Sequence, residues 1–457
     1  MEFKQFFDII VIGGGPGGYH FANLASKNNF SVALFEEKGL GGTCLNEGCI
    51  PSKSLLKSAK IADEISNSTE YGILVEKKLI NQLEIIERKN RLVNKLVLGV
   101  RGSLRKNKVK LFFSHANILQ QDGDTFFISC ENEIYACSKL VIATGSEVVF
   151  PRLKGIEEGI RNGIVLSSRE ILNLTEIPKK LTVIGGGVIG LEMASYFNAV
   201  GSEVTVIEAS DKICGNMDLE CSNILMKNLS NRGINFKLSA LATEICEGGI
   251  TIKVADNYEF IASDKILMAV GRKPNLLNFG LENLNIKYST KGIIVNEFMQ
   301  TSLENVFAIG DVNGKVMLAH TAYAEAEVCV DYLSNKTTHL NYDNIPSVIY
   351  TLPESSWVGI NEEMAREKGI NFAVKKLSMA YSGRSVVEDP SLDGLCKIIV
   401  DLNKNTIIGA TIVGGYASEL IALIFNLIAL EVTIDKIIRL VFPHPTVGEI
   451  IKDTLTT

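Results

Sequence analysis

Short apolar runs, each followed by glycines and a helical pattern, recur along this 457-residue chain. The first run, at 7–12, leads into Gly13, Gly15 and Gly18 and then into a helix. A second apolar strand, at 31–35, ends at Glu36, 18 residues after the last glycine. Glycines allow a sharp turn and a close approach to a pyrophosphate at the helix N-terminus, and the acid can bind ribose hydroxyls. The pattern predicts a dinucleotide site.

The same order of elements returns in a second segment, at 179–208. An apolar strand precedes Gly185, Gly187 and Gly190, and the next strand ends at Glu208, again 18 residues after the last glycine. The two glycine motifs are offset by 172 residues (185 minus 13). Two such units predict two dinucleotide cofactors, typically a tightly held flavin and a diffusible nicotinamide.

Candidate redox chemistry lies just after the first unit, in the segment 41–53. Four residues separate Cys44 from Cys49, so one turn of helix can bring their sulfurs within disulfide reach. A helix that begins here would direct its positive end at the sulfurs, and we expect this to lower the pKa of the thiols. Two buried structural cysteines are the alternative that the spacing alone leaves open.

A candidate general base lies near the end of the chain, where Glu449 follows His444 by five residues. A loop that contains proline could fold the carboxylate back onto the imidazole, which would orient the ring and raise its basicity. In the segment 306–312, Gly310 allows a close backbone approach and Asp311 could bind a sugar-alcohol hydroxyl.

These motifs together resemble the flavoprotein disulfide reductases, also called pyridine nucleotide-disulfide oxidoreductases, and within them the branch that oxidises dihydrolipoamide. The matching segments extend from about Phe7 to Glu449. Besides the glycine motifs and the dithiol, they are VIATGSE at 141–147, AVGRKPN at 269–275, VFAIGDV at 306–312, MLAH at 317–320, IPSVIYTLPESSWVG at 345–359 and FPHPTVGEI at 442–450.

The resemblance implies an enzyme that binds FAD and NAD and oxidises protein-bound dihydrolipoamide, in a 2-oxo acid dehydrogenase complex or in glycine cleavage. It assigns Cys44 as the interchange thiol, Cys49 as the thiol that faces the flavin, and His444 with Glu449 as the base. It implies that Lys53 lies at the flavin and pairs with Glu192. Further cofactor contacts are implied at Gly42, Thr43, Thr144, Gly145, Gly271, Leu318 and Ala319.

The fold class that follows is α/β, with two Rossmann-like domains, one inserted in the other, and a C-terminal α+β dimerisation domain. We expect FAD-binding segments at 1–148 and 276–344, the NAD-binding domain at 149–275 and the dimerisation domain at 345–457. The resemblance further implies a homodimer in which His444 reaches the dithiol of the partner subunit, and a lipoyl-bearing acyltransferase or carrier protein as partner.

Two other functions remain open. One is an NADPH-dependent reductase of glutathione or another small disulfide, but no arginine cluster follows Glu208 and only Lys212 could contact a 2′-phosphate. The other is a non-catalytic, lipoyl-binding structural subunit. At two positions, Phe442 and Thr321, the chain has a different residue from many members of the family. These differences affect which subfamily the chain resembles, but not the proposed chemistry.

Composition limits the remaining possibilities. A net charge of −6 gives no reason to expect a nucleic-acid partner, and the longest apolar stretch, 420–430, is too short to span a membrane. The start of the chain has no secretory pattern, so we expect a cytoplasmic protein. The segment 88–110 carries nine Lys or Arg residues and predicts a solvated helix. We read the seven cysteines other than Cys44 and Cys49 as core thiols and expect no metal site.

Overall fold

The computed structural model describes all residues from Met1 to Thr457. The chain forms two compact units. Unit 1 comprises Met1–Ser54, Ile86–Val149 and Gly271–Leu340, and unit 2 comprises Leu55–Ile85, Phe150–Val270 and Asn341–Thr457. The four predicted domain segments stay predictions, whereas the α/β class with Rossmann-like sheets and a C-terminal domain is confirmed.

Unit 1 is built on a seven-stranded sheet in the order β3-β2-β1-β6-β5-β4, with β19 paired to β6. The strands β1, β2, β3, β6 and β19 run parallel, and β4, β5 and β6 form an antiparallel meander. The bounds are β1 Gln5–Ile12, α1 Pro16–Lys27, β2 Val32–Phe35, α2 Gly42–Glu47, β3 Lys110–Phe112, β4 Ala116–Asp122, β5 Thr125–Cys130, β6 Glu133–Ile142, β7 Ser146–Val148, β16 Arg272–Pro274, η2 Leu281–Asn283, β17 Tyr288–Ser289, β18 Gly292–Ile293, β19 Val306–Ala308, η3 Gly310–Asn313 and α9 Ala319–Leu333.

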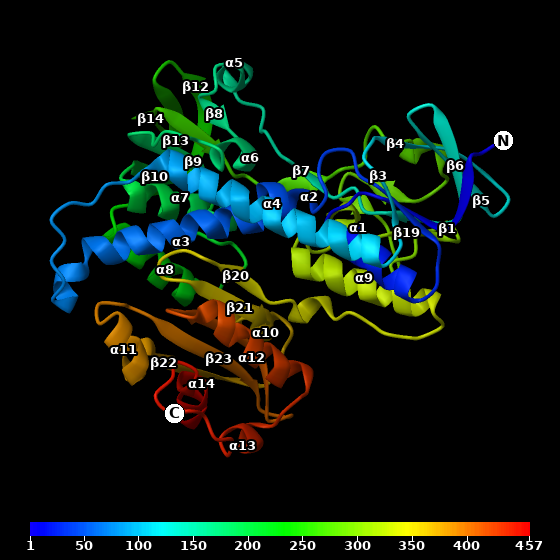
Figure 1. Cartoon of the computed structure of the whole chain (residues 1–457). Helices are drawn as coiled ribbons and strands as arrows, with labels where there is room; N and C mark the ends of the chain where they lie inside the picture. The colour runs from blue at the N-terminus through cyan, green and yellow to red at the C-terminus, as the bar shows by residue number, and fades with distance from the viewer. The chain divides into compact units, whose positions relative to one another are not determined.

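The first strands of unit 1 are apolar on both faces because both faces are covered. Ile9, Ile10 and Val11 are fully buried, as parallel strands between helices require. The helices α1 and α9 pack against one another, and Figure 1 shows them side by side. The carboxyl ends of β1, β2, β6 and β19 thus meet at the edge where the glycine motif begins.

The middle of unit 2 repeats this design with the all-parallel sheet β11-β10-β9-β15-β8. The antiparallel strands β12, β13 and β14 form a separate three-stranded sheet. The bounds are η1 Ser68–Tyr71, α5 Ile156–Arg161, β8 Val165–Leu166, α6 Ser168–Ile171, β9 Lys180–Ile184, α7 Val188–Val200, β10 Glu203–Ile207, α8 Leu219–Asn231, β11 Asn235–Lys237, β12 Ala240–Cys246, β13 Gly249–Val254, β14 Asn257–Ala262 and β15 Lys265–Met268.

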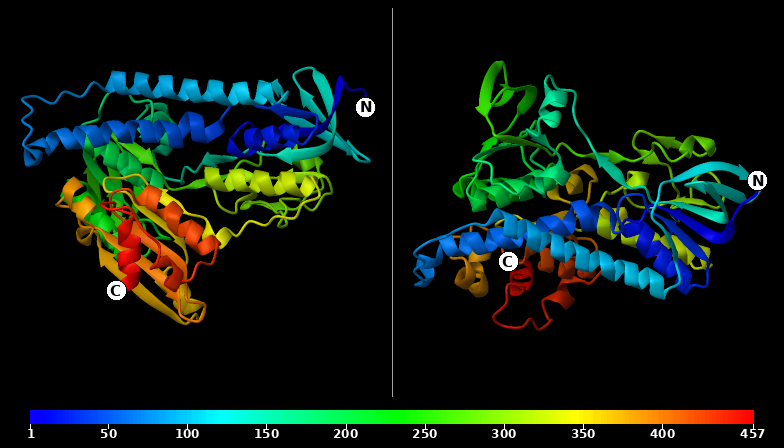
Figure 2. Two further views of the ribbon diagram at one scale, coloured as in Figure 1. Left: turned by 60° about the horizontal axis from the view of Figure 1, so that its bottom comes forward. Right: turned by 45° about the horizontal axis from the view of Figure 1, so that its top comes forward.

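The C-terminal part of unit 2 is an antiparallel sheet in the order β20-β21-β24-β23-β22 (Figure 2). The bounds are η4 Tyr342–Asn344, β20 Ser347–Ile349, β21 Ser355–Gly359, α10 Glu362–Glu367, β22 Phe372–Ser378, η5 Met379–Tyr381, α11 Gly383–Glu388, β23 Leu395–Asp401, β24 Thr406–Val413, α12 Ala417–Ala429, α13 Ile434–Ile437 and α14 Glu449–Thr456.

Strand β23 is buried on both faces, and its side chains alternate between two sets of neighbours. Cys396, Ile398 and Val400 pack in the core cluster that includes residues of α12 and α14. Ile399 packs instead with Ala365 of α10. Because side chains of a strand alternate between its faces, Lys397 shares the face of Ile399. The Lys397 ammonium therefore lies on the face of β23 that packs against α10.

Two long helices continue from one unit into the other: α3 (Cys49–Ser66) and α4 (Gln82–Lys106). Helix α4 confirms the helix predicted for the basic segment. Within a single chain, Leu92 and Leu96 of its apolar stripe are 37% and 42% exposed, whereas Leu104 is fully buried. None of the helices combines the length and the apolar character needed to cross a membrane.

Candidate functional site

The glycine motif of unit 1 closes a tight turn between β1 and α1. Gly13 has a φ of +107°, and a Cβ on it would lie 2.2 Å from the carbonyl oxygen of Ala143. A Cβ on Gly18 would lie 1.8 Å from the carbonyl oxygen of Gly13. The backbone N–H of Gly14 donates to Glu36 Oε2 at 2.7 Å, so the acid at the end of β2 holds the loop. Glycine is therefore required at both positions.

Unit 2 repeats the geometry almost atom for atom. Gly185 has a φ of +106°, and a Cβ on Gly190 would lie 2.1 Å from the carbonyl oxygen of Gly185. The N–H of Gly186 donates to Glu208 Oε2 at 2.7 Å. No side chain caps the N-terminus of α1, which follows Gly15, or that of α7, which follows Gly187. Uncapped N–H groups at a helix start can bind a pyrophosphate.

The residues of unit 1 fit FAD. The N-terminus of α9, at Leu318 and Ala319, also has no side-chain cap. The hydroxyl of Thr321, in the first turn of this helix, is fully buried and has no hydrogen-bond partner in the protein. A buried hydroxyl is seldom left without a partner unless a ligand or a water completes it. Gly310 has a φ of +74° and begins the short helix η3, which carries Asp311.

Sequence reasoning missed two residues beside Asp311, namely Ser146 and Arg272. The Ser146 hydroxyl donates to Asp311 Oδ2, and Arg272 Nε donates to Ser146 Oγ at 2.8 Å. Arg272 also donates to Thr43 Oγ1 at 3.4 Å. It therefore connects the predicted cofactor-contact segments 41–53, 141–147 and 269–275. Thr144 donates to the carbonyl of Asn275 at 2.9 Å in the same region. Arg272 directly follows the predicted Gly271 within AVGRKPN, so its position in the motif was the available signal.

The dithiol lies near the N-termini of two consecutive helices, the short α2 and the long α3. Cys44 is on α2, and Cys49 is the first residue of α3, with Gly48 between the helices. The prediction of a single helical turn was wrong, because Gly48, with φ −149° and ψ −110°, ends α2. Gly42, with a φ of +57°, lets α2 begin against α1: a Cβ on Gly42 would lie 2.6 Å from the Gly15 Cα. The dithiol is therefore built onto the first dinucleotide loop.

Cys44 and Cys49 are both partly buried, and neither is in a disulfide, so the structure describes the reduced pair. The hydrogen bond with Cys49, together with burial, raises the pKa of Cys44, although the Lys53 ammonium acts in the opposite direction. The predicted lowering by the helix N-terminus was thus wrong for Cys44. A thiol that shares its proton with a neighbouring sulfur has a higher pKa, so it loses that proton only at a higher pH.

A pair of tyrosines that sequence reasoning missed lies beside the dithiol. The hydroxyls of Tyr19, on α1, and Tyr323, on α9, are hydrogen-bonded to one another. Burial and this hydrogen bond raise the pKa of Tyr19, and negative charge on Cys44 or Cys49 would raise it further. Both phenols therefore stay neutral. His20 packs edge-on against Tyr323 and contacts Glu327 Oε1 at 3.1 Å.

The candidate base has the predicted arrangement. His444 Nδ1 lies 3.1 Å from Glu449 Oε1, and the N–H of Thr446 donates to Glu449 Oε2 at 2.9 Å. The Thr446 N–H and the His444 imidazole lower the pKa of Glu449. The His444 side chain is 82% exposed, so Nε2 remains accessible to a substrate proton. The loop folds the carboxylate back, as expected from the five-residue spacing.

The predicted Lys53–Glu192 pairing and the predicted approach of His444 to the dithiol each join the two units, and both stay predictions. Within its own unit, Lys53 lies 3.4 Å from Ser52 Oγ. Glu192 is almost fully buried and accepts a hydrogen bond from the N–H of Tyr350 at 3.2 Å. Gly145, with a φ of +73°, follows Thr144 at the end of β6.

The other cysteines and the acidic groups form no second reactive centre. Cys130, Cys137, Cys214, Cys221, Cys329 and Cys396 are buried, and Cys246 is partly buried. Burial raises the pKa of Cys137 and of Cys396 to about 12, so these thiols stay protonated at neutral pH. No group of three or more His, Cys, Asp and Glu side chains is arranged to hold a metal ion.

Known proteins resemble this chain over nearly its whole length. Dihydrolipoyl dehydrogenase from Chlamydia muridarum is 35% identical over 449 residues, which cover 98% of this chain and 96% of the relative. Mitochondrial dihydrolipoyl dehydrogenase from Pisum sativum is 36% identical over 458 residues, which cover 98% and 90%. The solved structure of the HOCl-induced flavoprotein disulfide reductase RclA from Escherichia coli matches with a TM-score of 0.86 at 26% identity, covering 98% of this chain and 99% of that one.

Two family models match in sequence. The model for pyridine nucleotide-disulphide oxidoreductases matches residues 7–326, and the model for the dimerisation domain of the same family matches residues 345–455. The doubled dinucleotide loops, the dithiol and the base lie within these matches. The chain belongs to the pyridine nucleotide-disulphide oxidoreductases, flavoproteins that use FAD and NAD(H).

Proposed function

We propose that this enzyme oxidises dihydrolipoamide to lipoamide and reduces NAD. The observation that carries the proposal is that one chain contains both a dithiol on the first dinucleotide loop and an exposed imidazole whose Nδ1 lies 3.1 Å from Glu449 Oε1. Curated relatives that are 35% and 36% identical are dihydrolipoyl dehydrogenases, which supports the same substrate here.

The first step is a proton transfer. A carboxylate at Nδ1 fixes the tautomer of His444 and leaves Nε2 as the acceptor, so the imidazole can remove the proton from one thiol of dihydrolipoamide. The substrate thiolate attacks the Cys44 sulfur of the Cys44–Cys49 disulfide. The new sulfur–sulfur bond joins substrate and Cys44, and Cys49 leaves as a thiolate.

The second substrate thiol, once deprotonated, attacks its own mixed disulfide and closes the lipoamide ring. Cys44 is released and takes up a proton, which the hydrogen bond to Cys49 helps it to retain. Two electrons have then passed from the substrate to the dithiol. FAD held at the loop of Gly13, Gly15 and Gly18 would supply the two-electron redox chemistry that connects the dithiol with NAD.

We infer NAD rather than NADP from the end of β10. Glu208 presents a carboxylate where a ribose binds in this fold, and a carboxylate repels a 2′-phosphate. Residues 209–218 contain no arginine. The shared site of a homodimer, a lipoyl-bearing acyltransferase or carrier protein as partner, and a cytoplasmic location remain part of this proposal.

Steady-state turnover with free dihydrolipoamide tests the proposal. The FAD-loaded enzyme should reduce NAD⁺ with dihydrolipoamide, and both Cys44→Ser and His444→Gln should remove nearly all of this activity. Faster turnover of NADPH with glutathione disulfide would favour the small-disulfide reductase instead. If no turnover occurred with either substrate while FAD was bound, the chain would be a non-catalytic subunit.

A further inference from the structure

The segment 209–218 connects the predicted ribose acid Glu208 with α8 and contains one cation, Lys212. Its ammonium lies 3.4 Å from the carbonyl oxygen of Met217 and 3.9 Å from Glu363 Oε2. Only 18% of the Lys212 side chain is exposed. The one cation able to approach a 2′-phosphate is therefore engaged by a carboxylate of α10, in the C-terminal domain.

Helix α10 is held firmly in place by its own contacts. The Asn361 side chain caps its N-terminus by accepting from the N–H of Met364 at 2.9 Å. Ala365 is fully buried and packs with Ile399 of β23. Glu362, next to Glu363, lies 3.0 Å from the Lys397 ammonium. The backbone position of Glu363 is thus set by a packed helix.

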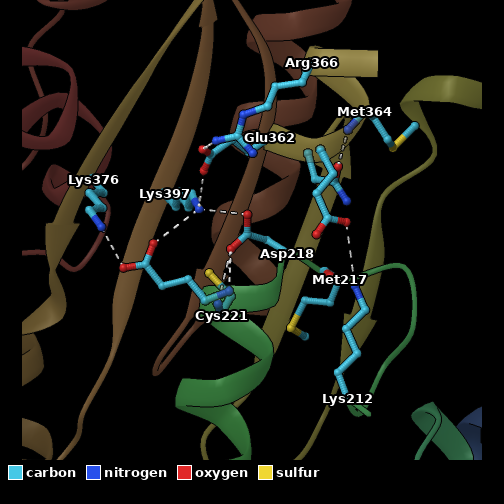
Figure 3. A network of polar contacts seen from close by, with 12 residues as sticks. Lys212, Met217, Asp218, Cys221, Glu362, Met364, Arg366, Lys376 and Lys397 are labelled. Atoms are coloured by element: carbon cyan, nitrogen blue, oxygen red, sulfur yellow. Dashed lines mark hydrogen bonds and ion pairs between the residues drawn. The ribbon is translucent and has the colours of Figure 1, made fainter. Parts of the chain in front are cut away.

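The C-terminal end of the segment 209–218, at Asp218, is held by Lys397 of β23, which also contacts α10 (Figure 3). Asp218 caps α8 by accepting from the N–H groups of Glu220 and Cys221 at 3.0 and 3.3 Å. Asp218 Oδ2 also lies 2.8 Å from the Lys397 ammonium, which is 5% exposed. Lys212 therefore contacts α10, and Asp218 contacts β23. Both residues are thus held by contacts with this part of the C-terminal domain.

We propose that Glu363 is a specificity residue for the nucleotide, because it holds the Lys212 ammonium away from the place where a 2′-phosphate would bind. Glu208 repels the 2′-phosphate directly. Glu363 engages the Lys212 ammonium, the positive charge that could otherwise offset this repulsion. The inference deepens the proposed preference for NAD and rests on it. The Glu363 side chain is 56% exposed, and an ion pair with an exposed partner contributes little, so we expect the release of Lys212 to change affinity by a small factor.

The test measures binding of ADP-ribose and of 2′-phospho-ADP-ribose to the FAD-loaded protein by isothermal titration calorimetry. Glu363→Gln should tighten binding of 2′-phospho-ADP-ribose about two- to fivefold and leave ADP-ribose unchanged. Glu367→Gln is the matched control, because this exposed carboxylate lies on the same helix and no ion pair engages it. This control should bind both ligands like the wild type.

The double variant Glu363→Gln, Lys212→Met separates a released cation from a general change in charge. It should lose the gain shown by Glu363→Gln. A gain that persisted in the double variant, or an equal gain in Glu367→Gln, would overturn the role of Glu363, as would the absence of any gain. The proposed function fails independently: tighter binding of 2′-phospho-ADP-ribose than of ADP-ribose by the wild type would contradict the NAD preference itself.

Discussion

At the scale of single residues, the chemistry could be predicted where a short motif contains both partners. Cys44 and Cys49, or His444 and Glu449, are close in sequence, and their spacing limits how their side chains can meet. Arg272, Tyr323 and Glu363 could not be assigned in this way, because each meets its partner across more than 100 residues of chain. Their roles depend on the packing of separate elements.

The proposed roles of the two thiols predict different spectra for the two cysteine variants. In Cys44→Ser, Cys49 can remain as a thiolate beside FAD and should give a long-wavelength charge-transfer absorbance. In Cys49→Ser that absorbance should be missing, because Cys44, in its proposed role as interchange thiol, does not face the flavin. Both variants should keep FAD and lose lipoamide turnover. The reverse pattern of absorbance would exchange the two assigned roles.

Glu449→Gln should lower kcat/KM for dihydrolipoamide about 10- to 100-fold. The amide keeps the shape of the side chain but loses the charge that orients His444 and stabilises its protonated form. The measurement is the steady-state rate at several pH values, with the KM for NAD⁺ as the internal control. A variant with unchanged kcat/KM at neutral pH would show that the carboxylate is not needed by the base.

At the scale of elements, the sequence predicted the two glycine-turn units well, because glycine conformation and apolar strands are local properties. The loops at Gly13 and Gly185 have nearly the same φ, and in both the next glycine, Gly14 or Gly186, bonds an acid 22 residues further along the chain. The break at Gly48 was missed, since glycine inside a helical pattern does not always end a helix. The cluster around Lys397 involves three separate elements and gives no local signal.

Lys397→Met should lower the free energy of unfolding by about 3 kcal/mol, because it leaves Asp218, Glu220 and Glu362 without their shared cation. Burial alone would lower the pKa of Lys397, but the hydrogen bonds and charges of Asp218 and Glu220 outweigh burial and raise it. The stabilisation is therefore complete at neutral pH and is lost only as the pH rises through this elevated value.

Urea unfolding of the FAD-loaded protein, followed by circular dichroism, measures this loss. Lys376→Met is the matched control, since this ammonium bonds Glu220 at 2.7 Å but is 53% exposed. It should cost less than about 1 kcal/mol. Equal effects of the two substitutions would show that burial of Lys397 adds nothing to the cluster.

At the scale of the whole molecule, the family match indicates a dimer, which a single chain does not show by itself. The dimerisation-domain model covers residues 345–455, which include His444 and Glu449. The dithiol and the base belong to different compact units. A shared active site in a two-fold dimer is consistent with this division of the chemistry.

Mixed dimers test the shared site. Cys44→Ser and His444→Gln homodimers should both be inactive, whereas a heterodimer keeps one site with an intact dithiol and an intact base. Purified heterodimers should recover up to about half of the wild-type activity. Recovery is measured as dihydrolipoamide turnover, with FAD content as the control. No recovery at full FAD content would place His444 within its own subunit or outside the reaction.

The alternation of side chains along β23 also has a consequence for how the strand finds its place in the sheet. A slip by one residue would exchange the two faces, so that Lys397 would enter the aliphatic core beneath α12 and α14. The three carboxylates would then face Cys396 or Ile398 and lose their cation. Both changes are strongly unfavourable. The buried lysine thus favours the native register of β23 over a register shifted by one residue.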